Sequence, residues 1–266
     1  MILRKRQKGA FEGPYAIRPG FFKPGLIVEF DKSLRSMLSY PKMTQAIIAI
    51  AKNFINLLYP LHCATCNRTL DALNKLGVCD FCLSQIKPHP EPCCQKTGLY
   101  FKRAYSACLY DGVLKELIHL FKYKKKLALG GALSGLMEDF IRDNHEIMYD
   151  LDIITFVPLH SRRLRQRGFN QSNMLASSLS KEFDISIRDI LEKPISTRHQ
   201  NELSRGQRLT NLKNVFKIRD GTSVKGLRIL LIDDVMTTGA TLSECAKALL
   251  SNGAKEVRCL ALARGL

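Results

Sequence analysis

Two adjacent acids at the end of an apolar run are the residues in this sequence best suited to bind a ligand. Asp233 closes the run "RILLID", and with Asp234 it opens the string "DDVMTTGAT" at 233–241. Small and hydroxyl-bearing residues follow them at once: Met236, Thr237, Thr238, Gly239, Ala240 and Thr241. Amides at the start of a helix, the positive end of its dipole and small hydroxyls together bind phosphate. The turn therefore predicts a phosphate cradle with two carboxylates beside it.

A ribose diol supplies two hydrogen-bond donors that suit such a pair of carboxylates. We therefore expect a sugar ring whose 5′-phosphate lies in the turn and whose hydroxyls bond the acids. Gly239 permits a backbone conformation that a residue with a Cβ resists. The alternative is an ordinary strand-to-helix turn in which Asp234 or Thr237 caps the helix. Capping alone explains neither the second acid nor the Thr-Thr-Gly run.

Four cysteines in two close pairs predict a metal site. Cys63 and Cys66 form one CxxC pair, and Cys79 and Cys82 form another after twelve intervening residues. Two such turns can present four thiolates to one tetrahedral ion, which fits a closed structural Zn²⁺ site. The alternative is a set of buried, apolar cysteines. Nine cysteines without a secretory signal favour metal binding in a reducing cytoplasm over a disulfide framework.

Arginines without acids follow a predicted strand in "HSRRLRQRG" at 160–168. Guanidinium groups there could neutralise a diphosphate, follow a DNA backbone, or simply be solvated. A second basic stretch runs from 193 to 217, and Lys122 begins a third, "KYKKK". Together they predict a basic rim, beside which Phe121, Tyr123, Phe169 and Phe216 could stack unpaired bases; the alternative is that these rings pack in the core. The arginines in question are Arg162, Arg163, Arg165 and Arg167.

The overall charge agrees with a polyanionic partner. Lys and Arg outnumber Asp and Glu by 41 − 24 = 17, and this excess attracts nucleic acid, phosphorylated ligands or anionic surfaces. A generally basic, solvated surface is the alternative. No run of 18 or more apolar residues exists, so we expect no membrane span. The N-terminal stretch does not read as a signal peptide, and we expect a cytoplasmic protein.

The elements that would position these groups alternate between strand and helix. We expect strands at 152–159, 228–233 and 256–263, and helices at 113–121, 127–141, 170–183 and 241–254. Continuous apolar strands of this kind predict an α/β fold, a parallel sheet covered by helices on both faces. Ligands of such sheets bind beyond the carboxyl ends of the strands. We expect a loosely ordered basic tail at 1–42, a helix plus Cys-rich module at 43–98, and the sheet domain at 99–266.

The string "ILLIDDVMTTGAT" resembles the signature of type I phosphoribosyltransferases, which bind 5-phosphoribosyl 1-diphosphate (PRPP). "VPLHSRRLRQRGFNQ", "RHQNELSRGQRLTNLKNVF" and "LIHLFKYKKKLALGGAL" resemble the ComF family of competence-associated proteins. The resemblance covers about residues 45–266. It implies a type I phosphoribosyltransferase-like domain with a small zinc-ribbon-like N-terminal module, and PRPP bound with Mg²⁺. It also places a diphosphate loop at Val157, Pro158, Leu159 and His160, and a mobile loop near 193–217.

The cysteines depart from the family pattern. The family usually has a third pair, CxxCG, where this chain has adjacent Cys93 and Cys94. Either of these is therefore an alternative ligand to one of the first four. Cys108, Cys245 and Cys259 fall in helix or strand patterns and are expected to pack in the core.

Three functions remain open from the sequence. The first is a ComF-like, PRPP-binding protein of DNA uptake in natural transformation, which contacts single-stranded DNA and DNA-uptake or helicase components. The second is an active phosphoribosyltransferase with an unidentified base or amine as acceptor. The third is a zinc-bearing nucleic-acid adaptor that binds no PRPP, against which the intact acid pair and turn argue.

Overall fold

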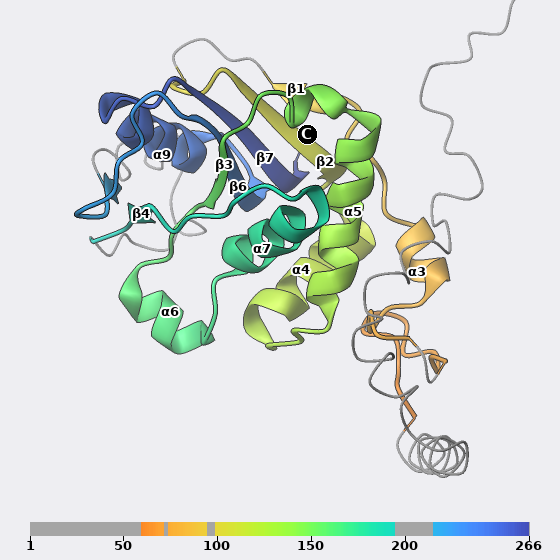
Figure 1. The fold of residues 1–266 in the computed structure, drawn as a ribbon. Helices are drawn as coiled ribbons and strands as arrows, with labels where there is room; N and C mark the ends of the chain where they lie inside the picture. Colours follow the sequence, from red (N-terminus) through yellow and green to blue (C-terminus); the bar gives the residue numbers. More distant parts are fainter. Residues whose placement is uncertain (1–59, 72–73, 95–98, 195–214, 266) are drawn as a thin grey trace, which may run out of the picture. The chain divides into compact units, whose positions relative to one another are not determined.

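A computed structural model describes residues 60–71, 74–94, 99–194 and 215–265. The predicted tail at 1–42 and the helix expected from residue 44 lie outside the described residues, as does most of the basic stretch at 193–217. Residues from Tyr59 to Leu266 form one compact unit. Figure 1 shows its sheet with helices beside it.

The sheet has five strands in the order β1-β2-β7-β6-β3. All neighbouring pairs are parallel except β1, a two-residue strand antiparallel to β2. This confirms the predicted parallel sheet. The strands are β1 (Cys93–Cys94), β2 (Arg103–Leu109), β3 (Ile153–Phe156), β6 (Arg228–Met236) and β7 (Glu256–Arg264).

Helices cover both faces of this sheet, which explains why its strands are apolar on both sides. On one face, α9 (Ala240–Ser251) packs Leu242, Cys245 and Leu249 against Ile229 and Leu231 of β6. The opposite face carries α4 (Gly112–Tyr123), α5 (Leu129–Asp143) and α7 (Gln171–Phe183). Figure 1 shows these three helices grouped together, away from α9.

The observed elements differ from the predicted ones in three places. β6 continues through the acids to Met236, because β7 pairs with it as far as Met236↔Arg264. β2 was not predicted, since its buried residues include Ser106 and small side chains. The basic segment at 160–168, which was not among the expected helices, forms the short helix α6 (Ser161–Arg167).

Smaller elements complete the described chain. α3 (Asp80–Ser84) begins right after Cys79, and the 3₁₀ helix η2 (His145–Ile147) precedes β3. β4 (Leu191–Glu192) pairs antiparallel with β5 (Lys217–Ile218) in a separate two-stranded sheet. No helix in the described part of the chain is long and apolar enough to cross a bilayer.

Candidate functional site

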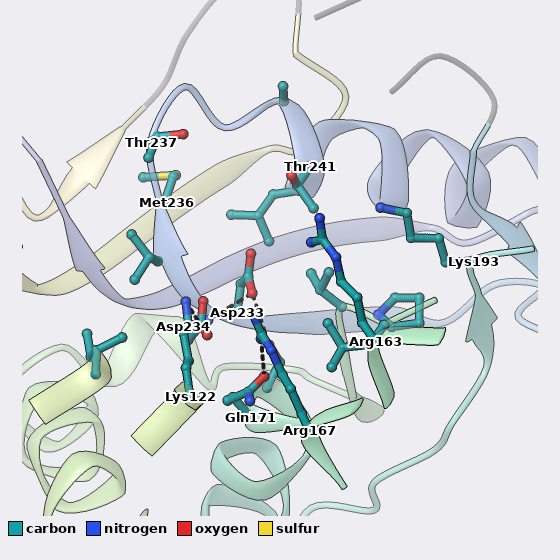
Figure 2. Close-up of a pocket in the computed structure, with 18 of the residues that line it drawn as sticks. Lys122, Arg163, Arg167, Gln171, Lys193, Asp233, Asp234, Met236, Thr237 and Thr241 are labelled. Atoms are coloured by element: carbon teal, nitrogen blue, oxygen red, sulfur yellow. Dashed lines mark hydrogen bonds and ion pairs between the residues drawn. The ribbon is translucent and has the colours of Figure 1, made fainter. Parts of the chain in front are cut away.

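A cavity of about 410 Å³ lies where β6 ends and α9 begins, and α4, α6 and α7 supply its other walls. Most of the side chains singled out in the sequence line it (Figure 2). They are Lys122, Val157, Pro158, Leu159, His160, Arg163, Arg167, Asp233, Asp234, Met236, Thr237, Gly239, Ala240 and Thr241. Thr238, Arg162 and Arg165 are not among its lining residues. The fold therefore gathers segments far apart in the sequence around one space.

The two acids are held by different helices. Asp233 and Asp234 are neighbours on β6, and their partners come from α7 and α4, two helices on the same face of the sheet. Asp233 accepts a hydrogen bond from the Ser172 hydroxyl of α7 at 2.9 Å, through the Oδ1 that also accepts from the amide of Asp234. Asp234 Oδ2 lies 2.7 Å from Nζ of Lys122 on α4. Both carboxylates thus have fixed orientations at the edge of the cavity.

Burial changes the acidity of Asp233. Removal from water raises the pKa of this carboxyl to about 7, and the nearby charge of Asp234 adds to the effect. Lys122 and the hydrogen bonds from the Asp234 amide and Ser172 act in the opposite direction. Asp233 therefore loses its proton near neutral pH. Once ionised, its carboxylate can accept hydrogen bonds from the hydroxyls of a ligand.

The turn after the acids has the backbone that a phosphate cradle needs. Gly239 is the N-cap of α9 with φ of 81°, a left-handed conformation that favours glycine. The Thr238 hydroxyl accepts from the amide of Ala240 at 3.3 Å, a local capping contact. Thr237, Gly239, Ala240 and Thr241 all border the cavity. The start of α9, with its positive dipole end, therefore opens onto the same space as the acids.

The segment after β3 is fixed between two helices. Asn170, the N-cap of α7, donates from Nδ2 to the carbonyl of Val157 at 3.0 Å and accepts from the Ser172 amide. His160 is the N-cap of α6, and its Nδ1 accepts from the amide of Arg162 at 3.2 Å. Gly168 ends α6 with φ of 86°. The caps at His160 and Gly168 explain why the basic segment forms a helix and not a loop.

Helix α6 separates its arginines by face. Arg163 and Arg167 are four residues apart, which places them on one side of a helix, and both line the cavity. Arg162 and Arg165 are exposed. Arg167 donates from Nη1 to Oε1 of Gln171 at 3.0 Å, and its guanidinium lies 4.9 Å from the centre of the Tyr123 ring. Arg167 is therefore held in place before any ligand arrives.

Sequence reasoning missed Gln171 and Ser172, the first two residues of α7. Gln171 is only 1% exposed, and its Nε2 has no hydrogen-bond partner among the described residues. A buried donor of this kind is costly unless something accepts from it. The sequence signal that could have found them is the run Asn-Gln-Ser at 170–172. Asn170 is a favourable N-cap, and the two residues after it are polar at the start of a predicted helix.

Crowded cations mark the far side of the cavity. Lys193 follows β4 and lies 5.4 Å from the Phe216 ring centre. Burial, and then the charge of Arg163, lowers the pKa of Lys193 to about 8. Burial and the charge of Arg167 likewise lower the pKa of Arg163. Because each cation makes its neighbour's charge less favourable, an anion bound between them would be stabilised.

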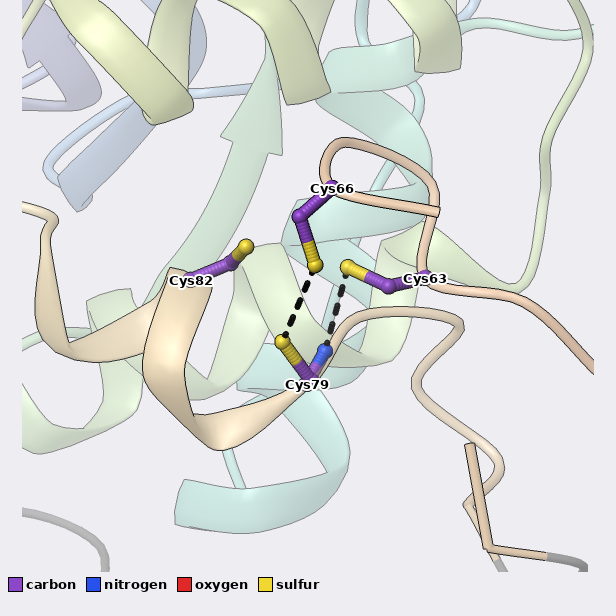
Figure 3. A group of neighbouring side chains, drawn as sticks. All are labelled: Cys63, Cys66, Cys79 and Cys82. Carbon is purple, nitrogen blue, oxygen red and sulfur yellow. Dashed lines mark hydrogen bonds between the residues drawn. The ribbon is translucent and has the colours of Figure 1, made fainter. Parts of the chain in front are cut away.

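The four predicted metal ligands come together in the structure. The Sγ atoms of Cys63, Cys66, Cys79 and Cys82 all lie within 4.8 Å of one another (Figure 3). Four thiolates about 2.3 Å from a tetrahedral Zn²⁺ would be about 3.8 Å apart, so these residues fit that ion. Cys66 and Cys79 already have their sulfurs 3.6 Å apart. Cys93 belongs to β1 and is outside this group.

Two of these thiols differ in acidity. Burial raises the pKa of Cys82 to about 12, and the neighbouring thiols add to that rise. Burial also opposes ionisation of Cys63, yet hydrogen bonds from the Thr65 hydroxyl and from backbone amides lower its pKa to about 5. A metal ion needs thiolates, so Cys63 is already suited to ligation and Cys82 would lose its proton on binding.

Comparisons with known proteins agree with both parts of the chain. A family model described as "Phosphoribosyl transferase domain" matches residues 169–266, and one described as "Double zinc ribbon domain" matches residues 54–110. A hypoxanthine phosphoribosyltransferase structure from Staphylococcus aureus is 20% identical and covers 51% of this chain and 64% of its own, with a TM-score of 0.34. A TM-score at that level carries no argument of its own.

Relatives in sequence identify the family. "DNA utilization protein YhgH" of Salmonella typhimurium is 32% identical over 223 residues, which are 77% of this chain and 97% of that protein. "Competence protein F" of Haemophilus influenzae is 32% identical over 233 residues, which are 80% of this chain and 99% of that protein. At this identity and coverage, the chain belongs to the ComF family, which its motifs resemble.

Proposed function

We propose that this chain binds PRPP with Mg²⁺ in the cavity at the end of β6, as a ComF-like protein of DNA uptake. One observation carries the proposal: Asp233, Asp234 and the turn residues Thr237, Gly239, Ala240 and Thr241 border a single cavity. The 5′-phosphate fits the start of α9, where the dipole favours an anion. The sugar hydroxyls fit the two carboxylates, which accept hydrogen bonds when ionised.

The diphosphate fits the opposite wall. Val157, Pro158, Leu159 and His160 form the segment that leads into α6, and Arg163 and Arg167 follow on the cavity side. Mg²⁺ would arrive with the diphosphate, whose charge it shares. Guanidinium groups bind phosphoryl oxygens in two-pronged pairs, and Arg167 is already oriented by Gln171. The buried Nε2 of Gln171 would then find an acceptor in the ligand.

The crowded cations also favour a second candidate, transfer of the phosphoribosyl group. Departure of diphosphate from the sugar leaves positive charge at C1, and no covalent nucleophile is required. Arg163, Arg167 and Lys193 would stabilise the charge that develops on the leaving group. The fixed acids would hold the sugar in position. This candidate function also requires an acceptor substrate, a base or an amine, that receives the phosphoribosyl group.

The basic rim supports contact with single-stranded DNA. Arg162 and Arg165 are exposed, Lys124, Lys125 and Lys126 are exposed at the end of α4, and Tyr123 beside them is 50% exposed. Cations of this kind follow a phosphate backbone, and exposed aromatic rings stack on bases. The names of the relatives, which refer to competence and DNA utilization, agree with this role. DNA-uptake or helicase components would then be its protein partners in the cytoplasm.

The cysteine cluster supports one structural Zn²⁺ ion, held by Cys63, Cys66, Cys79 and Cys82. All four positions of a tetrahedral ion would be filled, so the metal would stabilise the module and take no part in chemistry. The zinc module would fall within 43–98 and the phosphoribosyltransferase-like domain within 99–266. A zinc-bearing nucleic-acid adaptor without PRPP binding remains the third reading, to be decided by titration.

The deciding experiment is calorimetric titration with PRPP and Mg²⁺. Asp233→Asn with Asp234→Asn should abolish binding, because the side chains keep their shape and lose their charge. Asp184→Asn with Asp220→Asn removes the same charge from two exposed positions outside the cavity and should leave the affinity unchanged. An unaltered affinity in the cavity variant would refute PRPP binding at the acids. Diphosphate release with a panel of bases and amines would separate binding from transfer.

A further inference from the structure

A second cavity, of about 330 Å³, lies at the other end of the strands from the acids. It is formed where β2 and β7 begin, together with η2 and the turn that follows it. It shares no lining residue with the first cavity. Its walls combine cations and aromatic rings with one acid: Lys102, Arg103, Tyr105, His145, Glu146, Tyr149 and Arg258.

Two arginines stand side by side in this cavity. Arg103 of β2 and Arg258 of β7 are direct partners in the register of the two strands, so their side chains leave the same face. Like charges directly opposite each other destabilise a sheet unless something neutralises them. Arg258 has its neutralising partner, because its Nε donates to Glu256 at 2.6 Å.

Arg103 is less committed. Its Nη1 donates a long hydrogen bond, 3.5 Å, to the hydroxyl of Tyr105. A guanidinium carries five N–H donors in a planar fork, so most of its donors remain available. Lys102, which lines the same cavity, is bonded to Glu256 at 2.9 Å and adds positive charge nearby. A phosphate group would pair with the Arg103 fork through two of these donors.

Tyr149 supplies a ring on a fixed support. Its side chain is 70% exposed, yet Arg258 Nη1 donates to the carbonyls of Glu146, Ile147 and Tyr149 at 3.0, 3.2 and 2.6 Å. One largely shielded guanidinium, with 11% of its side chain exposed, therefore holds three carbonyls of this turn. An exposed aromatic ring on a rigid backbone can stack on a base with little loss of entropy.

We propose that this second cavity binds one nucleotide of single-stranded DNA, with its phosphate on Arg103 and its base stacked on Tyr149. A strand is favoured over a free nucleotide because one guanidinium and one ring bind a single nucleotide only weakly. In a strand, contacts to the neighbouring nucleotides add to this weak binding. The strong net positive charge of the chain would hold the rest of the strand. The inference does not depend on PRPP binding.

The test measures binding of a fluorescent oligothymidylate to the full chain by anisotropy. Arg103→Ala and Tyr149→Ala should each weaken binding about tenfold, and Tyr149→Phe should restore it, since stacking of one base is the interaction removed. Arg188→Ala and Tyr100→Ala are matched controls, because both residues are exposed and lie outside the two cavities. Their affinities should stay within about twofold of the parent chain.

Two further readouts separate the contributions of phosphate and base. Arg103→Ala should flatten the salt dependence of log affinity by about 0.7, whereas Tyr149→Ala should leave that slope unchanged. The effect of Tyr149→Ala should disappear with an abasic strand. Equal losses in the site variants and the controls would overturn the proposal. Displacement of the strand by free thymidine monophosphate at concentrations similar to those of the strand would also overturn it. PRPP affinity, measured in parallel, should not change.

Discussion

Lys122 on α4 and Asp234 on β6 form an ion pair of 2.7 Å at the edge of the larger cavity. The pair is largely shielded from water, with 17% and 13% of the two side chains exposed. It neutralises one of two adjacent acids, while Ser172 bonds the other. A sugar diol that reached these carboxylates would therefore compete with Lys122 for Asp234. Contacts from α4 and α7 therefore stabilise the two adjacent carboxylates in the absence of a ligand.

Replacing Lys122 should destabilise the chain. Lys122→Met would leave Asp234 beside Asp233 without its counter-charge, and we expect a loss of about 1–3 kcal/mol in the free energy of unfolding. Urea denaturation at neutral pH would measure it. Lys124→Met is the matched control, because Lys124 is exposed and should lose less than about 0.5 kcal/mol. If the loss persists in full when Asp234 is also changed to Asn, the ion pair is not its cause.

Stability should depend on pH through Asp233. The pKa of this carboxyl is about 7 in the folded chain and about 3.9 when unfolded. The folded state therefore keeps a proton that the unfolded state has lost between about pH 4 and 7. The stabilisation from this proton is complete below about pH 4 and disappears as pH rises through about 7. A shift of about three pKa units sets an upper limit of about 4 kcal/mol.

Asp233→Asn tests this dependence. Asn keeps an oxygen that can accept from Ser172 and Asp234 but does not titrate, so the variant should lose this component of the pH dependence. Urea unfolding at pH 5 and at pH 8 would give the two differences in stability. Relative to the variant, the parent chain should be less stable at the higher pH. Parallel pH profiles for both proteins would contradict the raised pKa.

The acids, the turn and the cysteine pairs could be predicted because each is a short, continuous pattern. The contacts that arrange them could not, because they join distant segments. Ser172 reaches Asp233 only when α7 packs beside β6, and Lys122 reaches Asp234 only through α4. The helical nature of α6 was in principle detectable, since His160 and Gly168 cap it. β2 was hidden because Ser106 and small residues fill its buried positions.

Zinc should depend on the four clustered cysteines and on no others that the structure describes. Elemental analysis of natively purified protein should give about one Zn per chain. Cys63→Ser or Cys79→Ser should remove it and destabilise the module. Cys108→Ser and Cys245→Ala alter buried cysteines outside the cluster and should retain the metal. Folded, monodisperse protein without zinc would contradict a structural metal.

The two faces of α6 should have separable functions. Arg163 and Arg167 line the cavity, whereas Arg162 and Arg165 are exposed on the same helix. Arg163→Gln with Arg167→Gln should weaken PRPP binding at least tenfold, because each charge-assisted hydrogen bond contributes roughly 1.5–3 kcal/mol. Arg162→Glu with Arg165→Glu should leave PRPP affinity unchanged and reduce affinity for single-stranded DNA.

Salt dependence separates specific contact from general attraction in this comparison. If Arg162 and Arg165 each neutralise a phosphate, reversing them should flatten the slope of log affinity against log salt by about 1.4, or about 0.7 for each contact. Arg4→Glu with Arg6→Glu changes the net charge equally at the N-terminus and should flatten it much less. Any chain with this charge binds DNA weakly at low salt, so the contrast between the two variants is decisive. Equal losses in both, or binding that vanishes at physiological salt, would make the DNA contact nonspecific and favour phosphoribosyl transfer as the function of the cavity.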